Sequence, residues 1–121
     1  MTLKRSELVI YAVVLREHPD VVKVGRTTKW KSRRREYDRW NFAQSNGVLA
    51  CAVYVITEEY ADLAMIEKAV LNGMALTCPA FSGTEWFKAG LDRARATIES
   101  VLTDAGLSYT EAHPHRLRLA A

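Results

Sequence analysis

Residues 8–25 read LVIYAVVLREHPDVVKVG, and this stretch decides the fold. Its first eight residues are apolar and rich in β-branched side chains. That composition is typical of a strand buried on both faces. The segment Arg16–Asp20 contains Pro19, and Pro-Asp favours a tight reversal. Val21–Gly25 then predicts a second strand, so the whole stretch indicates a β-hairpin.

The remainder of the chain predicts helices and a third strand, from apolar spacing and from capping and turn residues. In order, we expect a helix over Lys31–Gln44, a strand over Val48–Ile56, a helix from an N-cap at Thr57 to Met74, a loop over Leu76–Gly83, a candidate short strand at Glu85–Phe87 and a helix over Leu91–Ala105. The fold class is therefore α+β. We expect a small, mainly antiparallel three-stranded sheet, made of the hairpin and the third strand and flanked by about three helices.

The length of 121 residues and the 49% share of hydrophobic residues fit one domain with one core. We place that domain over residues 1–107 and a C-terminal tail over 108–121. The sequence has no run of about 18 apolar residues and no signal-peptide pattern, so we expect a cytoplasmic protein with no membrane span. Cys51 and Cys78 lack the spacing of a metal site and are expected to be free thiols.

The net charge of +3 hides an uneven distribution. The segment Lys23–Arg39 holds eight Lys or Arg and two acidic residues, a local net charge of +6, so the rest of the chain sums to −3. Such a field favours an anionic partner at one place on the surface. The alternative is a solvated helix face that only aids solubility.

The basic helix cannot aim all of its arginines at one site, because successive helical residues point about 100° apart. Arg33, Tyr37 and Trp40 share one face, and the aromatic residues of that face should pack inward. Arg33 is therefore expected to be held partly inward, while Arg34 and Arg35 turn toward solvent. The expected contacts to a nucleic-acid backbone are Arg26, Lys29, Lys31, Arg34, Arg35 and Arg39.

Three other residues are candidates for a site. Tyr11 interrupts an aliphatic strand, although an isolated tyrosine there is more typical of a core. Gly25 would let a phosphate or a neighbouring strand approach the backbone closely. Glu67 falls within or beside the apolar stripe of its helix, where an unpaired carboxylate is costly. It is either half of a structural ion pair, with an arginine for example, or a ligand of Mg²⁺ facing a cleft.

The hairpin resembles that of the GIY-YIG nuclease superfamily, in particular its compact bacteriophage-associated branch. Ile10-Tyr11 matches the end of the family's first tripeptide, with Val9 where Gly usually stands. Lys23-Val24-Gly25 matches the second tripeptide, with Lys23 in place of Tyr. The run from Lys23 to Thr28, KVGRTT, is similar to a version frequent in that branch.

The resemblance continues through nearly the whole chain. Arg33 stands at the position of the family arginine, Tyr37 where the family often has His or Tyr, and Glu67 at the family glutamate. Gly83–Phe87 is similar to a late E-W-F element. Relatives in this branch often have a His soon after the Glu, and this chain has none there.

The resemblance implies a nuclease domain over residues 1–107 that hydrolyses phosphodiester bonds in nucleic acid, with DNA as the expected substrate. It implies catalytic roles for Tyr11, Lys23, Arg33, Tyr37 and Glu67. Glu67 would hold Mg²⁺ or Mn²⁺. Tyr11 would accept a proton once a neighbouring cation lowers the pKa of its phenol.

Two alternatives stay open at this point. The same scaffold would also serve as a nucleic-acid-binding module without catalysis. It would equally serve as a protein-interaction factor that neither metal nor nucleic acid stabilises. Since we find no attached recognition domain, we expect either weak specificity, or a homodimer or a partner protein that supplies specificity.

Overall fold

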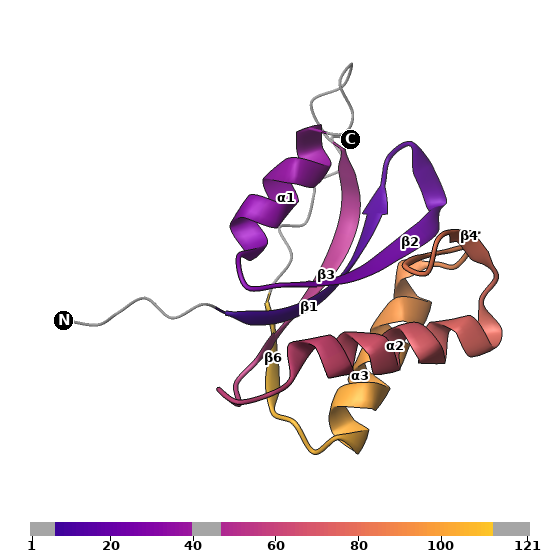
Figure 1. Ribbon diagram of the computed structural model, residues 1–121. Helices are drawn as coiled ribbons and strands as arrows, with labels where there is room; N and C mark the ends of the chain where they lie inside the picture. Colours follow the sequence, from indigo (N-terminus) through magenta and orange to yellow (C-terminus); the bar gives the residue numbers. More distant parts are fainter. Residues whose placement is uncertain (1–6, 40–46, 113–121) are drawn as a thin grey trace.

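The computed structural model describes residues 7–39 and 47–112, which form an α+β fold (Figure 1). Its elements are β1 (Leu8–Leu15), β2 (His18–Thr27), α1 (Trp30–Arg39), β3 (Val48–Ile56), α2 (Leu63–Thr77), β4 (Ala80–Ser82), β5 (Trp86–Phe87), α3 (Leu91–Asp104) and β6 (Tyr109–Ala112). The expected fold class is thereby confirmed. Among the described residues, no helix combines the length and the apolarity that crossing a membrane requires.

The strands form one sheet in the order β4-β5-β2-β1-β3-β6, and all neighbouring pairs are antiparallel. Within the described residues the sheet therefore has six strands, and the predicted three-stranded sheet was wrong in this respect. The three additional strands are only two to four residues long. Strands of that length carry no readable hydrophobic period, and pairing with the rest of the sheet is what orders them.

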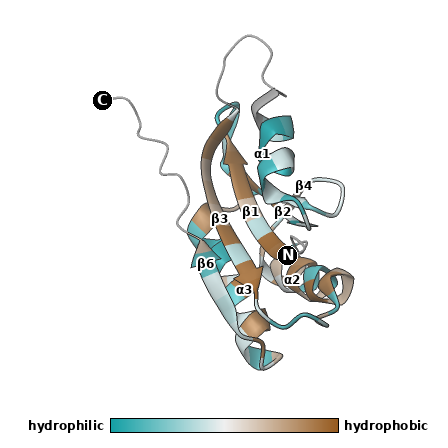
Figure 2. Cartoon of the chain, turned by 90° about the vertical axis from the view of Figure 1, so that its left-hand side faces the viewer, coloured by the Kyte–Doolittle hydropathy of each residue, from teal (hydrophilic) through white to brown (hydrophobic). Residues whose placement is uncertain are grey.

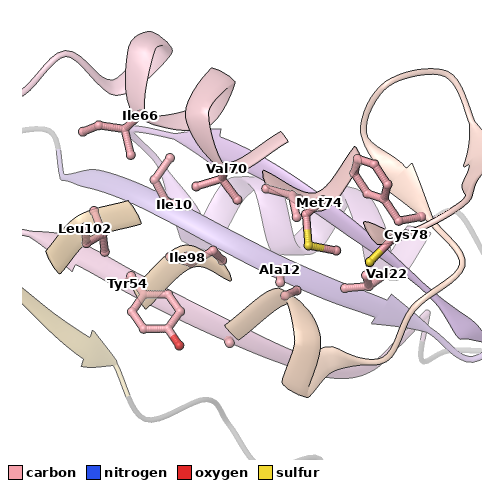
Figure 3. Close-up of a cluster of buried hydrophobic side chains, with 14 of the residues drawn as sticks. Ile10, Ala12, Val22, Tyr54, Ile66, Val70, Met74, Cys78, Ile98 and Leu102 are labelled. Carbon is pink, nitrogen blue, oxygen red and sulfur yellow. The ribbon is translucent and has the colours of Figure 1, made fainter. Parts of the chain in front are cut away.

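β1 separates the core into two layers, because alternate residues of a strand point to opposite faces. Ile10 and Ala12 pack on the face covered by α2 and α3, as Figure 3 shows. Tyr11 and Val13 pack on the opposite face, together with Tyr37 of α1. The hydropathy colouring of Figure 2 fits this arrangement, since β1 and β3 are hydrophobic along most of their length and α1 is largely hydrophilic.

α2 begins at Leu63, not after an N-cap at Thr57 as predicted. The N-cap is Asp62, whose Oδ1 accepts a hydrogen bond from the Met65 N–H at 3.1 Å. The Thr57 hydroxyl instead donates to the Ser108 carbonyl at 3.1 Å. Thr57 thus links the end of β3 to the start of β6 through this hydrogen bond. A local capping pattern cannot reveal such a contact between distant segments.

The hairpin turn is shorter than the predicted Arg16–Asp20. Leu15 of β1 already pairs with His18, so β2 starts three residues before Val21. Pro19 is tolerated there because it lies in the first residues of the strand, which are exposed.

Three other boundaries differ from expectation or lie beyond the described residues. α2 and β4 occupy most of the predicted loop at Leu76–Gly83. The predicted end of the basic helix, with Trp40, falls at residues 40–46, outside the described part. β6 falls within the segment that we assigned to a tail, and it pairs with β3. Cys51 and Cys78 are both buried, and Cys78 is a free thiol, as expected.

Substitution Asp62→Ala should lower the free energy of unfolding by about 1 kcal/mol, because the first turn of α2 loses its side-chain acceptor. Urea unfolding measures this difference. Asp104→Ala is the matched control, since Asp104 lies at the C-terminal end of α3, where a negative charge is not favoured by the helix dipole. Equal destabilisation by the two substitutions would contradict the assignment of Asp62 as N-cap.

Candidate functional site

Tyr11 and Gly25 lie opposite each other on the paired strands β1 and β2. A Cβ atom placed on Gly25 would be 2.5 Å from Tyr11 Cζ, far inside van der Waals contact. Gly25 therefore leaves the space into which the Tyr11 ring extends. We had expected that space to admit a phosphate or a neighbouring strand, and the structure fills it with the tyrosine itself.

The Tyr11 hydroxyl belongs to a buried chain of hydrogen bonds. It lies 2.6 Å from the Tyr37 hydroxyl, and Lys23 Nζ donates to that same Tyr37 hydroxyl at 2.8 Å. Trp30, at the start of α1, packs its ring at a tilt against Tyr11, with 4.9 Å between centroids. Lys23 points to the Tyr11 side of the sheet because it is an odd number of residues from Val22 and Val24, which face α2 and α3. Three residues predicted from the hairpin and the helix are thus in direct contact.

Glu67 lies on the sheet-facing side of α2, next to the buried Ile66. Its Oε1 accepts a hydrogen bond from Arg26 Nε at 3.1 Å. The side chain of Glu67 is 15% exposed and that of Arg26 is 48% exposed. The structure therefore contains the predicted ion pair with an arginine. It also brings Arg26, which we had expected among the outer backbone contacts, into the centre of the site.

Glu85 is a site residue that the sequence analysis did not select. Its carboxylate lies 3.4 Å from Lys23 Nζ. The available signal was its place immediately before Trp86-Phe87, in the E-W-F element. Nothing in the sequence indicated that β5 would pair with β2. This pairing brings Glu85 close to Lys23.

These side chains converge on one pocket of about 260 Å³, lined by Tyr11, Lys23, Gly25, Arg26, Arg33, Glu67 and Glu85. Three cationic and two anionic residues line it, a formal net charge of +1. Tyr11 is fully buried even though it lines the pocket. An anionic group would therefore meet the charged side chains first, and would reach the phenol only after they move apart.

Arg33 is the residue of α1 that lines the pocket, and the other basic residues described on α1 lie outside the pocket. The Arg33 side chain is 40% exposed, and its Nε lies 3.4 Å from Glu36 Oε2. This matches the expected partly inward position. The exposed Lys29, Lys31 and Arg35 and the half-buried Arg34 do not line the pocket. The side chain of Arg39 lies outside the described part of the structure.

Burial governs the ionisation of the two paired tyrosines. It raises the pKa of the Tyr11 phenol, and the carboxylates of Glu85 and Glu67 add to this effect. The hydrogen bond with Tyr37 and the Arg33 guanidinium act in the opposite direction but do not outweigh burial. The pKa of Tyr37 is also raised, again mainly by burial. Both phenols are thus protonated at neutral pH. The Arg33 cation acts on the pKa of Tyr11 in the expected direction, but in the free protein burial outweighs it.

Two carboxylates at the pocket could hold a divalent cation. The described residues contain no cluster of three or more His, Cys, Asp or Glu side chains placed to hold a metal ion. Mg²⁺ seldom needs such a cluster, because one or two carboxylates, waters and phosphate oxygens complete its coordination. Glu67 and Glu85 are the carboxylates at the pocket. The donor set therefore fits Mg²⁺ or Mn²⁺ held jointly with a phosphate ligand.

Comparisons with known proteins gave no match: no family model, no curated protein and no solved structure is significantly similar to this chain.

Substitution Gly25→Ala should displace the Tyr11 ring, because the new methyl group overlaps it and the buried ring has little room to move. We expect a loss of about 1–3 kcal/mol in unfolding free energy. Urea unfolding measures it, and near-ultraviolet circular dichroism reports the tyrosine environment. Gly90→Ala is the control for the tyrosine signal only, since a Cβ there meets nothing within 4 Å, whereas Gly90 is the N-cap of α3 and its replacement by Ala affects stability by itself. An unchanged tyrosine signal in Gly25→Ala would show that Tyr11 does not need the gap.

Proposed function

We propose that this chain is a metal-dependent endonuclease of the GIY-YIG type, which hydrolyses phosphodiester bonds in nucleic acid, DNA in the first instance. One observation carries the proposal. Tyr11, Lys23, Arg33 and Glu67 come from four different elements and line a single pocket. Tyr37 joins them through its hydrogen bonds to Tyr11 and Lys23.

The cationic side chains would receive the phosphate. Arg33 has a planar guanidinium at the pocket and would stabilise the charge that develops on the phosphoryl oxygens. Lys23 would add a second positive charge, held at the Tyr37 hydroxyl. Tyr11 would orient the attacking water and accept its proton. Because burial raises the pKa of Tyr11, this step requires additional positive charge near the phenol.

Glu67 would be the protein ligand of Mg²⁺ or Mn²⁺ and would release Arg26 when it takes that role. A divalent cation bound there would supply Lewis-acid stabilisation of charge on the phosphate oxygens. Arg26 would then be available to the nucleic-acid backbone. Around the pocket, the further backbone contacts would come from Lys29, Lys31, Arg34, Arg35 and Arg39. Their contribution should weaken steeply as the salt concentration rises.

The central test is incubation with supercoiled plasmid, single-stranded DNA and RNA, each with Mg²⁺ or Mn²⁺. We expect cleavage by the unaltered chain and a loss of at least about 100-fold in Arg33→Ala, as for removal of one transition-state donor. Glu67→Gln should also lose cleavage, because a neutral amide is a poor ligand for a hard cation.

Arg93→Ala and Glu17→Gln are the matched controls for that test. Arg93 is exposed on α3, Glu17 is exposed in the hairpin turn, and neither residue lines the pocket. Both controls should retain the full rate. Cleavage that persists in both Arg33→Ala and Glu67→Gln would refute this site as the source of the activity.

A second prediction concerns pH. With the pKa of Tyr11 held above its usual value near 10, only a small fraction of the phenol is ionised at neutral pH. If the phenolate is the base, the rate of cleavage should rise about tenfold per pH unit between roughly pH 6 and pH 9. Single-turnover rates at saturating metal measure this slope. Tyr11→Phe should lose both the rate and the slope, and a flat profile for the unaltered chain would exclude Tyr11 as the base.

The second candidate function is a nucleic-acid-binding module that does not cut. Two observations favour it: Arg26 already occupies an oxygen of Glu67, and Tyr11 is buried and protonated. In that case, DNA binding should be tight and salt-sensitive while no product forms with either metal. Glu67→Gln would then strengthen binding, because it removes a negative charge from the pocket.

A further inference from the structure

Lys23 is the charged member of the buried residues in the described part of the chain, with 8% of its surface exposed. An ammonium group removed from water is costly unless partners compensate its charge and satisfy its N–H donors. The partners of Lys23 therefore determine the position of its ammonium group. That position matters in this pocket, because Lys23 stands where the resembling family has a tyrosine.

Two partners of Lys23, Tyr37 and Glu85, connect it to the rest of the site. Lys23 Nζ donates to the Tyr37 hydroxyl at 2.8 Å, and Tyr37 lies 2.6 Å from the hydroxyl of Tyr11. A Glu85 carboxylate oxygen lies 3.4 Å from the same Nζ. The rings of Tyr37 and Trp86 lie 5.2 Å and 5.9 Å from the ammonium. The Lys23 ammonium thus contacts both the Glu85 carboxylate and the hydroxyl of Tyr37.

The backbone places Glu85 at this point. Lys23 of β2 pairs with Trp86 of β5, and the Val24 N–H donates to the Glu85 carbonyl at 3.0 Å. Pairing therefore continues one residue beyond the two-residue strand and sets Glu85 beside Lys23. Glu85 also lines the pocket, and its carboxylate lies 3.4 Å from the Lys23 ammonium.

Resting on the proposed function, we propose that Glu85 is a positioning residue: its carboxylate holds the Lys23 ammonium against the Tyr37 hydroxyl and so orders the Tyr11 end of the pocket. Glu85 does not itself touch the reacting phosphate in this arrangement. It acts through Lys23.

A purely stabilising role fits the geometry less well. The Glu85 side chain is 42% exposed, so solvent screens its attraction to Lys23 and the pair contributes little to folding. What the carboxylate does provide is a second contact to Nζ, which limits where the ammonium can lie while it donates to Tyr37. Its effect should therefore appear in the rate of the reaction and not in the stability of the fold.

A double-mutant cycle between Glu85→Gln and Lys23→Met tests the coupling. Glu85→Gln alone should lower kcat for cleavage by about 10- to 100-fold, the cost of a slightly misplaced group, with little change in KM for DNA. In the Lys23→Met background, the same substitution should change kcat by less than about twofold, because the group that it positions is absent. Equal losses in both backgrounds would mean that Glu85 acts directly on metal or substrate, and would overturn the proposal.

The control for this cycle is Glu17→Gln, which makes the same charge change in the exposed hairpin turn and should leave kcat unchanged. Both site substitutions keep the approximate length of the side chain, and the Glu85 side chain is 42% exposed, so water can replace its contact to Lys23 and folding should be retained. Thermal unfolding checks this directly. A large drop in Tm for Glu85→Gln would assign the residue to stability and would overturn the positioning role.

A second measurement needs no activity. Proton–nitrogen NMR spectra of the lysine ammonium groups should show a signal for Lys23 that is protected from exchange by burial. Glu85→Gln should shift this signal or broaden it beyond detection, whereas Glu17→Gln should not. An unchanged Lys23 signal in Glu85→Gln would overturn the proposal even if the chain is an active nuclease. A changed signal in a chain that cleaves nothing would support the positioning and refute the endonuclease.

Discussion

β1 is paired on both edges and buried on both faces, and the rest of the molecule depends on this strand. Its hydrogen bonds to β2 and β3 satisfy the backbone groups that burial would otherwise leave unpaired. Its side chains alternate between the α2–α3 layer and the α1 layer. A shift of one residue in register would exchange these two sets and would turn Tyr11 away from the pocket. The pairing of Tyr11 with Gly25 adds a second constraint, since the phenol fits only where a Cβ is absent.

The chemistry of the pocket follows from the cost of burying charge and phenol groups together. Lys23 is buried and is compensated by Glu85 and Tyr37. Glu67 is largely buried and is compensated by Arg26. Each ion pair contains one member that is at least 42% exposed, so each can exchange its partner for solvent or ligand more easily than a fully buried pair. A site that is closed by its own ion pairs and carries a net positive charge suits an anionic ligand that replaces protein carboxylates as partners.

Sequence reasoning predicted the positions of side chains correctly where a long element carried them. The apolar run of β1, the basic composition of α1 and the stripe on α2 each have a period that can be counted. Arg33, Tyr37 and Glu67 were therefore placed on the correct faces. Sequence reasoning failed where the position of a residue depends on contacts between distant segments. Thr57 bonds to Ser108 instead of capping α2, and Glu85 reaches Lys23 only because β5 pairs with β2. Of the three short strands, the sequence indicated only the one at Trp86–Phe87, and not the strand with which it pairs.

By itself, the sequence determined the α+β class, the hairpin, the three helices and the residues from which a site could be built, because local periodicity and turn chemistry are written in consecutive residues. Only the tertiary structure decided which of those residues meet. It selected Arg26 as the partner of Glu67, added Glu85 to Lys23 and placed Tyr11 in the space above Gly25. It also decided the protonation of Tyr11, because the pKa of a phenol depends on how completely the surrounding elements exclude water.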